Sequence, residues 1–247
     1  MNIIRPDWPA SSHIYAATTL RTSGMSSSVF ASWNMALHVG DNEKNVLANR
    51  ALLYQELNLS SEPVWLNQVH EATVVDASRI EVMVDADASF TQQPDVVCVV
   101  MTADCLPILL TDTRGEYIAA IHAGWRSLAR GVIEATVSNM NVKNGDLLAW
   151  LGPAISQASF EVGADVRDLF LAKSMKNKHA FKRVDTHAEK WLADLPMLAR
   201  LTLQKIGVNA IYGEQWCTYK DHSRFYSYRR SGETGRMATL IWKSMKV

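Results

Sequence analysis

Cysteine is scarce in this chain, whose 247 residues include three, at Cys98, Cys105 and Cys217. An odd number of cysteines in a chain of this length does not form a disulfide framework and is typical of proteins from a reducing compartment. No Cys-x-x-Cys pair is present, which excludes the usual structural zinc sites. We therefore expect a cytoplasmic protein without disulfides, in which Cys98 and Cys217 are structural residues.

Long apolar runs and an excess of one charge are missing too. No uninterrupted apolar stretch approaches the roughly 20 residues that a transmembrane helix needs, and the first residues lack the basic and then apolar pattern of a signal peptide. Lys+Arg 25 balances Asp+Glu 25, so the formal net charge is zero. A neutral chain has no electrostatic attraction to nucleic acid or to an anionic membrane. We expect neither as a partner, and no obligate protein partner is evident.

The composition, 48% hydrophobic and 20% charged, is that of a globular protein. There is no internal repeat, low-complexity segment or linker, so we expect a single domain over residues 1–247. Apolar periodicity predicts helices over 43–57, 127–140, 165–173 and 195–206. It predicts an extended segment over 64–70 and strands over 96–101, 108–110, 117–121, 147–151, 210–212, 225–228 and 237–242. Because strands and helices do not alternate strictly, we expect an α+β fold with central β-sheets sandwiched by helices.

Three strand-like runs each end on a side chain that can bind a metal ion: His70, Cys105 and His122. Two imidazoles and one thiolate are good zinc ligands, and three protein ligands leave the fourth tetrahedral position open for water or substrate. A metal at these residues is therefore expected to be catalytic. The same ligand set also suits copper with a weak axial methionine.

Each of these residues also has an ordinary structural interpretation. His70 alone fits a buried histidine bonded to a backbone carbonyl, Cys105 fits a small buried hydrophobe, and His122 fits a cap of the following helix. A further alternative drops the metal and pairs Cys105 with His122 as a thiol–imidazole dyad for acyl transfer. A binding module without catalysis is the third alternative.

Two further segments carry groups that suit a ligand. Gly124-Trp125-Arg126-Ser127 joins a strand to a helix N-terminus, where an anion is favoured, and Arg126 and Arg130 are spaced to face that anion together. The alternative is that Gly124 only permits the turn and that both arginines are solvated. The aromatic and basic residues of 225–230 can stack on a flat base, or can fill the core face of a strand.

At these residues the sequence resembles a known family over nearly its whole length. In chain order the matching blocks are Arg21, Ser32-Trp33-Asn34-Met35, His38-Val39-Gly40-Asp41-Asn42, Asn49-Arg50, Gln68-Val69-His70, Thr102-Ala103-Asp104-Cys105, His122-Ala123-Gly124-Trp125-Arg126, Leu151-Gly152-Pro153-Ala154-Ile155, Cys217-Thr218-Tyr219, Phe225-Tyr226-Ser227-Tyr228-Arg229-Arg230 and Thr234-Gly235-Arg236. Together they resemble the signature blocks of the YfiH family, also called the laccase-domain or polyphenol oxidoreductase family and, later, the purine nucleoside phosphorylase family.

The resemblance implies a fold related to the catalytic domain of cytotoxic necrotizing factors, and a zinc ion held by His70, Cys105 and His122. It implies phosphorolysis of adenosine, inosine and methylthioadenosine with inorganic phosphate, and adenosine deamination. One position departs from the family, because Ser23 stands where the early loop commonly has glycine. The resemblance therefore does not predict the conformation of that loop or any contact that the loop makes with substrate.

On this basis we assign roles to further residues as hypotheses. Asp104 is expected to support a zinc-bound histidine or to handle a proton, since such histidines need an outer partner. Arg21 and Arg126 are expected to hold phosphate, and Asn34 and His38 to line the nucleoside pocket.

The laccase name and the necrotizing-factor relationship suggest two other activities. Multicopper oxidases assemble their copper cluster largely from His-x-His pairs, and the seven histidines of this chain include no such pair. True laccase chemistry is therefore discounted, while copper stays an alternative to zinc. The Cys105–His122 dyad would instead give an amidase or deamidase, acting for example in the correction of peptidoglycan precursors.

Overall fold

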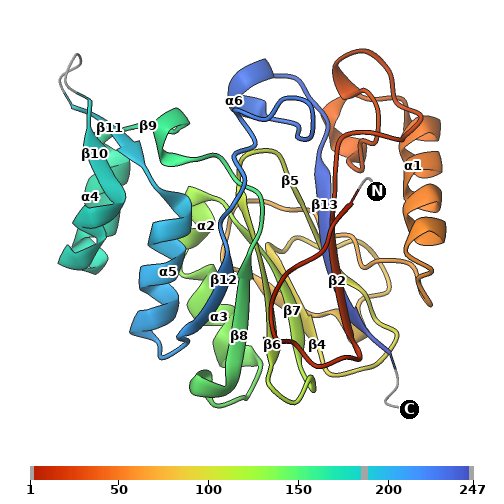
Figure 1. Cartoon of the computed structure of the whole chain (residues 1–247), viewed down its shortest axis with the longest axis horizontal. Coiled ribbons are helices and arrows are strands. Elements are labelled where there is room, and N and C mark those ends of the chain that lie inside the picture. Colours follow the sequence, from red (N-terminus) through yellow and green to blue (C-terminus); the bar gives the residue numbers. More distant parts are fainter. Residues whose placement is uncertain (1–2, 185–188, 245–247) are drawn as a thin grey trace.

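Two β-sheets pack face to face in the computed structural model, and helices cover both outer faces, which gives four layers (Figure 1). The structure describes residues 3–184 and 189–244. The expectation of an α+β fold with central sheets sandwiched by helices is confirmed. None of the helices in these two ranges has the length and apolar character needed to cross a bilayer.

The smaller of the two central sheets contains strands from both the first and the last parts of the chain. Its strands are antiparallel and lie in the order β1 (Ile3–Ile4), β2 (Ile14–Thr19), β13 (Met237–Lys243) and β5 (Cys98–Thr102). Since β13 pairs with β2 on one side and β5 on the other, the last described strand lies at the centre of this sheet.

The larger sheet has six strands and carries the site described below. Their order is β12 (Ala210–Gly213), β8 (Leu147–Leu151), β6 (Leu106–Asp112), β7 (Ile118–Ala123), β4 (Ala88–Thr91) and β3 (Val74–Asp76). Only the outer pairs, β12 with β8 and β3 with β4, are parallel. Every residue of β6, β7 and β8 is buried, which explains why these strands are apolar in the sequence apart from Thr111, Asp112 and His122.

The helices bury the outer faces of the sheets. Leu53 and Leu57 at the end of α1 (Glu43–Glu56) pack on the smaller sheet. The larger sheet is covered by α2 (Trp125–Arg130), α3 (Val132–Asn139) and α5 (Leu195–Lys205), with α4 (Ala164–Lys173) beyond them. A small three-stranded sheet of β10 (Phe181–Arg183), β11 (Lys190–Ala193) and β9 (Glu161–Gly163) lies beside α4 (Figure 1).

Three predicted elements differ from the structure. The helix predicted over 127–140 is two helices, because Gly131 adopts a left-handed conformation (φ 92°) and ends α2. The segment 64–70 makes isolated bridges at Val64 and Asn67 rather than a strand. The strand predicted over 225–228 is wrong: the hydroxyl of Tyr226 donates to the backbone oxygen of Phe30, and helix α6 (Tyr228–Ser231) follows at once.

Candidate functional site

The structure brings together the three residues that the sequence singles out as metal ligands. His70, Cys105 and His122 each offer one ligand atom, and these atoms lie within 4.8 Å of one another. His122 is on β7 and pairs with Pro107 of β6, while Cys105 directly precedes β6 and His70 lies in the loop that leads to β3. Residues 52 positions apart thus meet at one end of the larger sheet because its strands are neighbours.

Two residues of this cluster region adopt a left-handed backbone conformation. His70 has φ 62°, and Asp104, which precedes Cys105, has φ 90°. Such a conformation costs a residue other than glycine on the order of 1–3 kcal/mol and is common where a functional side chain has to be aimed. The cost at Asp104 is offset by three hydrogen bonds to its carboxylate, from the hydroxyls of Thr218 and Ser227 and from the backbone N–H of Arg229.

A fully buried carboxylate, Asp87, holds two members of the cluster. Its Oδ1 accepts hydrogen bonds from Nδ1 of His122 at 2.7 Å and from the backbone nitrogen of His70 at 3.0 Å. Its Oδ2 accepts a further bond from the backbone nitrogen of Glu71 at 2.7 Å. Because Nδ1 of His122 is engaged with Asp87, Nε2 is the nitrogen left to bind a metal ion.

The two imidazoles have opposite pKa shifts. Burial, together with the charge of His122, lowers the pKa of His70 to about 4, so this side chain is neutral and free to donate its lone pair. Burial acts in the same direction on His122, but the negative charge of Cys105 and the hydrogen bond to Asp87 outweigh it and raise the pKa of His122 to about 9. The raised pKa means that His122 carries a proton at neutral pH when no metal is bound.

Two observations show that the cluster fits a metal ion. Nδ1 of His70 is buried and has no hydrogen-bond partner, although buried polar atoms nearly always have one. A Cβ atom added to Gly124 would lie 2.9 Å from Nδ1 of His70 and 3.0 Å from Sγ of Cys105, so only glycine leaves these atoms free. Among the described residues this is the single group of three or more His, Cys, Asp or Glu side chains arranged to hold an ion.

The cluster opens into a cavity of about 670 Å³. The walls combine flat apolar side chains with several arginines, the combination that a flat, partly anionic ligand requires. The lining residues are His38, Gln68, His70, Met101, Thr102, Ala103, Asp104, Cys105, His122, Trp125, Arg126, Ile155, Phe160, Leu195, Tyr228, Arg229 and Arg236. Of the residues predicted to contact substrate, His38 and Arg126 therefore line the cavity.

The other predicted substrate residues lie outside that lining. Arg21 donates from Nε to the backbone oxygen of Ala31 at 3.1 Å, and its guanidinium lies over the ring of Tyr226. Asn34 is fully buried, and its amide oxygen accepts a hydrogen bond from the backbone nitrogen of Arg236 at 2.9 Å. Asn34 thus supports a lining residue from behind. The substrate roles of Arg21 and Asn34 stay predictions.

The structure also places Arg130 and Ser23, two residues that the sequence analysis singles out. Arg130 does not line the cavity; its guanidinium pairs with Glu71 at 2.9 Å and donates to the backbone oxygen of His70 at 2.8 Å. It thus holds the His70 loop rather than facing an anion with Arg126. Ser23, at the position where the family resemblance predicts glycine, adopts a left-handed conformation with φ 87°.

Several residues of the site were not predicted from the sequence. Asp87 lies in Asp85-Ala86-Asp87, a loop segment with no pattern that distinguishes its second acid from its first. Asp104 is predicted as a site residue beside a ligand histidine, and its carboxylate accepts hydrogen bonds from the hydroxyls of Thr218 and Ser227 and from the backbone N–H of Arg229. Phe160 and Leu195 enter the lining from distant segments, and only the folded chain shows their place.

Comparison with known proteins agrees with the resemblance seen in the sequence. The family model described as multi-copper polyphenol oxidoreductase laccase matches residues 15–244. "Purine nucleoside phosphorylase PA4543" of Pseudomonas aeruginosa is 46% identical, over 97% of this chain and 97% of the relative. "Purine nucleoside phosphorylase YfiH" of Escherichia coli is 44% identical, over 97% of this chain and 98% of the relative.

A crystal structure of a Neisseria meningitidis protein has the same fold, with a TM-score of 0.95 and 44% identity, covering 99% of this chain and 100% of the other. The agreement of family model, relatives and fold over almost the full length confirms the resemblance. This chain belongs to the laccase-domain family of YfiH proteins, whose model is described as multi-copper polyphenol oxidoreductase laccase.

Proposed function

We propose that this chain is a zinc-dependent purine nucleoside phosphorylase that uses adenosine, inosine and methylthioadenosine with inorganic phosphate. One observation carries the proposal: the His70–Cys105–His122 cluster lies in a cavity whose walls hold both aromatic rings and arginines. The names of the relatives at 44–46% identity support the same activity.

The nucleoside would bind against the aromatic side of the cavity. Tyr228 and Phe160 present rings to the lining, and a guanidinium lies near each: Arg236 at 5.8 Å from the centroid of Tyr228 and Arg229 at 5.1 Å from that of Phe160. A purine can stack on such a ring, and the adjacent cation strengthens the contact. Burial, together with the charges of Arg236 and Arg50, lowers the pKa of His38, which leaves a neutral imidazole suited to hydrogen bonding with ribose hydroxyls.

Phosphate would be held by the arginines of the lining. Arg126, Arg229 and Arg236 all face the cavity, and guanidinium groups bind phosphate oxygens in pairs. In phosphorolysis a phosphate oxygen forms a bond to C1′ of the ribose while the bond from C1′ to the purine nitrogen breaks. The electron pair of that bond leaves with the purine, which then takes up a proton. The arginines orient the nucleophile and the enclosing walls reduce competition from water.

His70, Cys105 and His122 would hold the zinc ion, which when bound supplies Lewis acidity toward an incoming oxygen. The orphaned Nδ1 of His70 and the space left by Gly124 support this assignment. The neutral charge of the chain and its two enclosed central sheets offer nothing that favours a nucleic acid or membrane partner, so nucleoside and phosphate are the partners we propose.

Incubation of the zinc-loaded protein with adenosine and phosphate tests the assignment. Adenine and ribose 1-phosphate are expected in equal amounts, and omission of phosphate should suppress both. The His122→Ala variant should lose this activity while its circular dichroism spectrum stays unchanged. Release of adenine at the same rate without phosphate would contradict phosphorolysis. Inosine formed from adenosine in the phosphate-free arm would reveal the deamination that the family resemblance implies.

A second candidate function is supported by the contact between His122 and Asp87. Cys105, His122 and Asp87 have the order nucleophile, base and orienting acid that thiol-dependent acyl transfer uses. In that case the metal-free protein would be the active form, as an amidase or deamidase. Ammonia release from glutamine-containing or amidated peptides by protein stripped of metal would support this candidate over the phosphorylase.

A further inference from the structure

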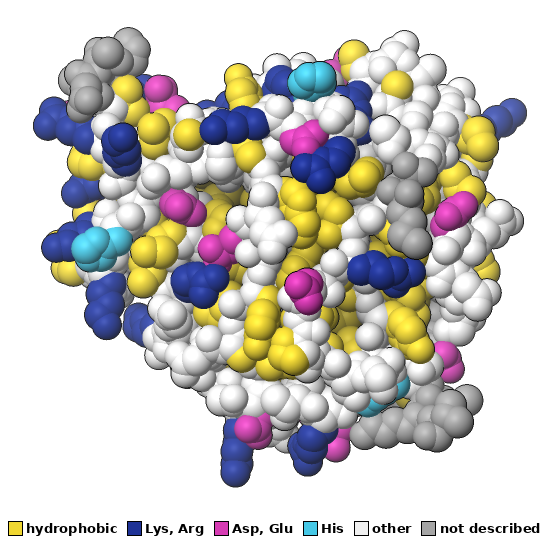
Figure 2. Space-filling model, viewed as in Figure 1, with side chains coloured by type: hydrophobic (Ala, Val, Ile, Leu, Met, Phe, Trp, Pro, Cys, Tyr) yellow, Lys and Arg dark blue, Asp and Glu magenta, His cyan; other side chains and the backbone are white. Residues whose placement is uncertain are grey.

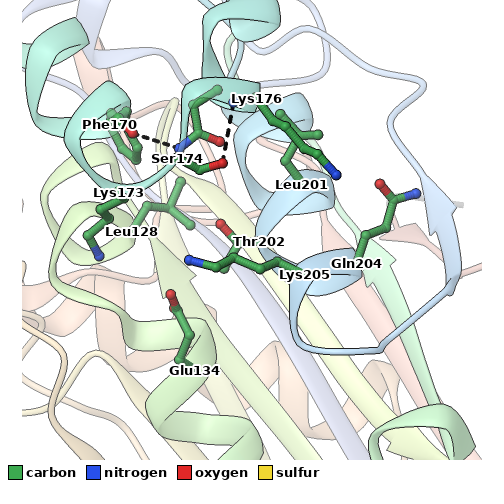
Figure 3. Close-up of a pocket in the computed structure, with 11 residues that line it drawn as sticks. Leu128, Glu134, Phe170, Lys173, Ser174, Lys176, Leu201, Thr202, Gln204 and Lys205 are labelled. Atoms are coloured by element: carbon green, nitrogen blue, oxygen red, sulfur yellow. Dashed lines mark hydrogen bonds between the residues drawn. The ribbon is translucent and has the colours of Figure 1, made fainter.

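A second cavity of about 730 Å³ lies on the helical side of the larger sheet. It is bounded by α2, α3, α4, the turn that follows α4, and α5 (Figure 3). Its lining residues are Leu128, Glu134, Phe170, Lys173, Ser174, Lys176, Asn177, Leu201, Thr202, Gln204 and Lys205, none of which lines the cavity at the metal cluster. The cavity is therefore separate from the site described above, and its occupant does not depend on the proposed function.

Positive charge dominates this second cavity. Lys173, Lys176 and Lys205 contribute three ammonium groups and Glu134 one carboxylate. Across residues 3–184 and 189–244 none of these four groups has an ion-pair partner within 4.0 Å. Lys and Arg side chains also gather along the edge formed by α4 and β10 (Figure 2). The local surplus of two positive charges matches a dianion.

Glu134 gives the cavity a hydrogen-bond acceptor beside these positive charges. Its Oε2 is buried and has no hydrogen-bond partner, and its carboxylate points into the gap between Lys173 and Lys205 (Figure 3). A buried acceptor without a donor is costly, because folding has removed it from water without replacing the hydrogen bond. A ligand with an N–H or O–H group would supply the missing donor.

Apolar side chains form one part of the remaining walls, beside the polar side chains of Ser174, Asn177, Thr202 and Gln204. Leu128, Phe170 and Leu201 form a surface that can cover a flat or carbon-rich body. A volume of about 730 Å³ is in the range of pockets that bind small metabolites. We propose that this cavity binds a phosphomonoester whose body carries a hydrogen-bond donor, that is, a nucleoside monophosphate or a sugar phosphate. A phosphomonoester carries a charge of about −1.5 to −2 at pH 7, which the lysines would neutralise.

Calorimetric titration with adenosine monophosphate, ribose 5-phosphate and inorganic phosphate, each used separately on the full chain, tests this proposal. The double variant Lys173→Ser, Lys205→Ser should bind at least one of the two esters at least tenfold more weakly than the unchanged chain. The matched control is Lys178→Ser, Lys182→Ser, which removes the same charge from exposed positions outside the cavity. The control should change the affinity less than twofold, and circular dichroism should show that both variants are folded.

Glu134→Gln gives a second readout that simple charge attraction would not produce. The glutamine cannot offer a charged acceptor, so binding of the ester should weaken about tenfold, while inorganic phosphate should bind equally well or more tightly. The ester that responds to both variants identifies the source, nucleotide or sugar phosphate. Equal losses in the cavity and control lysine variants, tighter ester binding by Glu134→Gln, or no binding of either ester at millimolar concentration would overturn the proposal. Lys173, Lys205 and Glu134 do not line the cavity at the metal cluster, so a change of affinity that is specific to their variants reports on this second cavity whether or not the chain is a phosphorylase.

Discussion

The carboxylate of Asp87 and the imidazole of His122 form a hydrogen bond of 2.7 Å that is closed off from solvent. The same oxygen of Asp87 accepts the backbone N–H of His70, so one acid fixes the ring of one candidate ligand and the main chain of another. Outer partners of this kind orient metal-binding histidines and increase their basicity.

Asp87→Asn is therefore expected to weaken zinc binding by about 10–100-fold, since the amide is a poorer acceptor and can present its N–H₂ to the imidazole. Competition with a chromogenic chelator measures the affinity. Asp85→Asn is the matched control, because Asp85 is exposed and lies two residues before Asp87. The zinc affinity of this variant should equal that of the unchanged chain. Equal affinity in the Asp87 variant would show that Asp87 serves only the fold.

Gly124 provides a steric test of the same cluster. In Gly124→Ala the new methyl group would lie 2.9 Å from Nδ1 of His70 and 3.0 Å from Sγ of Cys105, so these atoms must move apart. We expect zinc content to fall from about one ion per chain to less than half, with a cooperative thermal transition retained. In Gly145→Ala the methyl group meets nothing within 4 Å, and this variant should keep its zinc. Full zinc content in Gly124→Ala would place the ion elsewhere.

The sequence indicates the sheets well because buried strands leave a strong local signal, and it indicates the three residues of the candidate metal cluster by their chemistry rather than by their spacing. Apart from Thr111, Asp112 and His122, the runs that form β6, β7 and β8 are apolar because both of their faces are buried. Apolar runs of strand length between turn residues are recognisable without the fold. His70, Cys105 and His122 stand out because all three carry side chains that can bind a metal ion and all three lie at the ends of strand-like runs, although each one alone has an ordinary structural interpretation.

What the sequence does not show depends on contacts between distant segments. Asp87 meets His122 across 35 positions, and nothing in its local segment marks it. The aromatic pattern of 225–228 resembles a strand, yet Tyr226 is held by Phe30, which lies 196 positions earlier. Local periodicity carries no information about either contact, so the outer support of the site and its aromatic wall emerge only with the fold.

The pKa values of the cluster predict how zinc binding depends on pH. His122 has a pKa of about 9, above its ordinary value of 6.5, so near pH 7 its imidazole holds a proton that a metal ion must displace. Zinc affinity should therefore rise with pH up to about 9 and level off above it. In the metal-free protein the raised pKa stabilises the fold below pH 6.5, and this contribution is lost as the pH rises through about 9.

Calorimetry in two buffers with different ionisation enthalpies measures the proton directly. At pH 7.5 the unchanged chain should release about one proton for each zinc ion bound, and the Asp87→Asn variant should release less because the pKa of His122 falls. Zinc binding without proton release would contradict the raised pKa of His122.

Arg236 is expected to contribute to phosphate binding. It lines the cavity, and its backbone is held separately by Asn34, so a change of side chain leaves the backbone contact in place. Arg236→Lys should raise the KM for phosphate about tenfold or more, since a lysine cannot form a bidentate pair, with a smaller effect on kcat. Arg200→Lys, on the outer face of α5 and paired with Glu214, is the control and should leave both constants unchanged. A rise in the KM for adenosine alone would instead assign Arg236 to nucleoside binding.

The reactivity of Cys105 separates a metal ligand from a catalytic nucleophile. A thiolate bound to zinc is shielded, so iodoacetamide should modify Cys105 slowly in the zinc-loaded protein and faster after a chelator removes the ion. Burial raises the pKa of the Cys98 thiol to about 12, so Cys98 should stay unmodified in the folded protein and report on unfolding.

Cys217, which we expected to be an inert structural residue, needs separate treatment. It is only partly buried, and although burial disfavours its thiolate, hydrogen bonds from Ser156 and from the backbone of Lys220 and Tyr219 lower its pKa. The experiment is therefore best carried out in a Cys217→Ser background, so that all labelling at neutral pH is assigned to Cys105.

In that background Cys105→Ser should lower zinc content and adenine release in the same proportion, because a serine hydroxyl is a poor zinc ligand.

Mass spectrometry of the labelled protein that keeps Cys105, at successive times, gives the alkylation rate with and without the chelator. Faster labelling after chelation, together with the joint loss of zinc and activity, fits a ligand thiolate. Rapid labelling that ignores the chelator, with an amidase activity lost in step and zinc unaffected, would instead assign Cys105 as a nucleophile whose proton goes to His122.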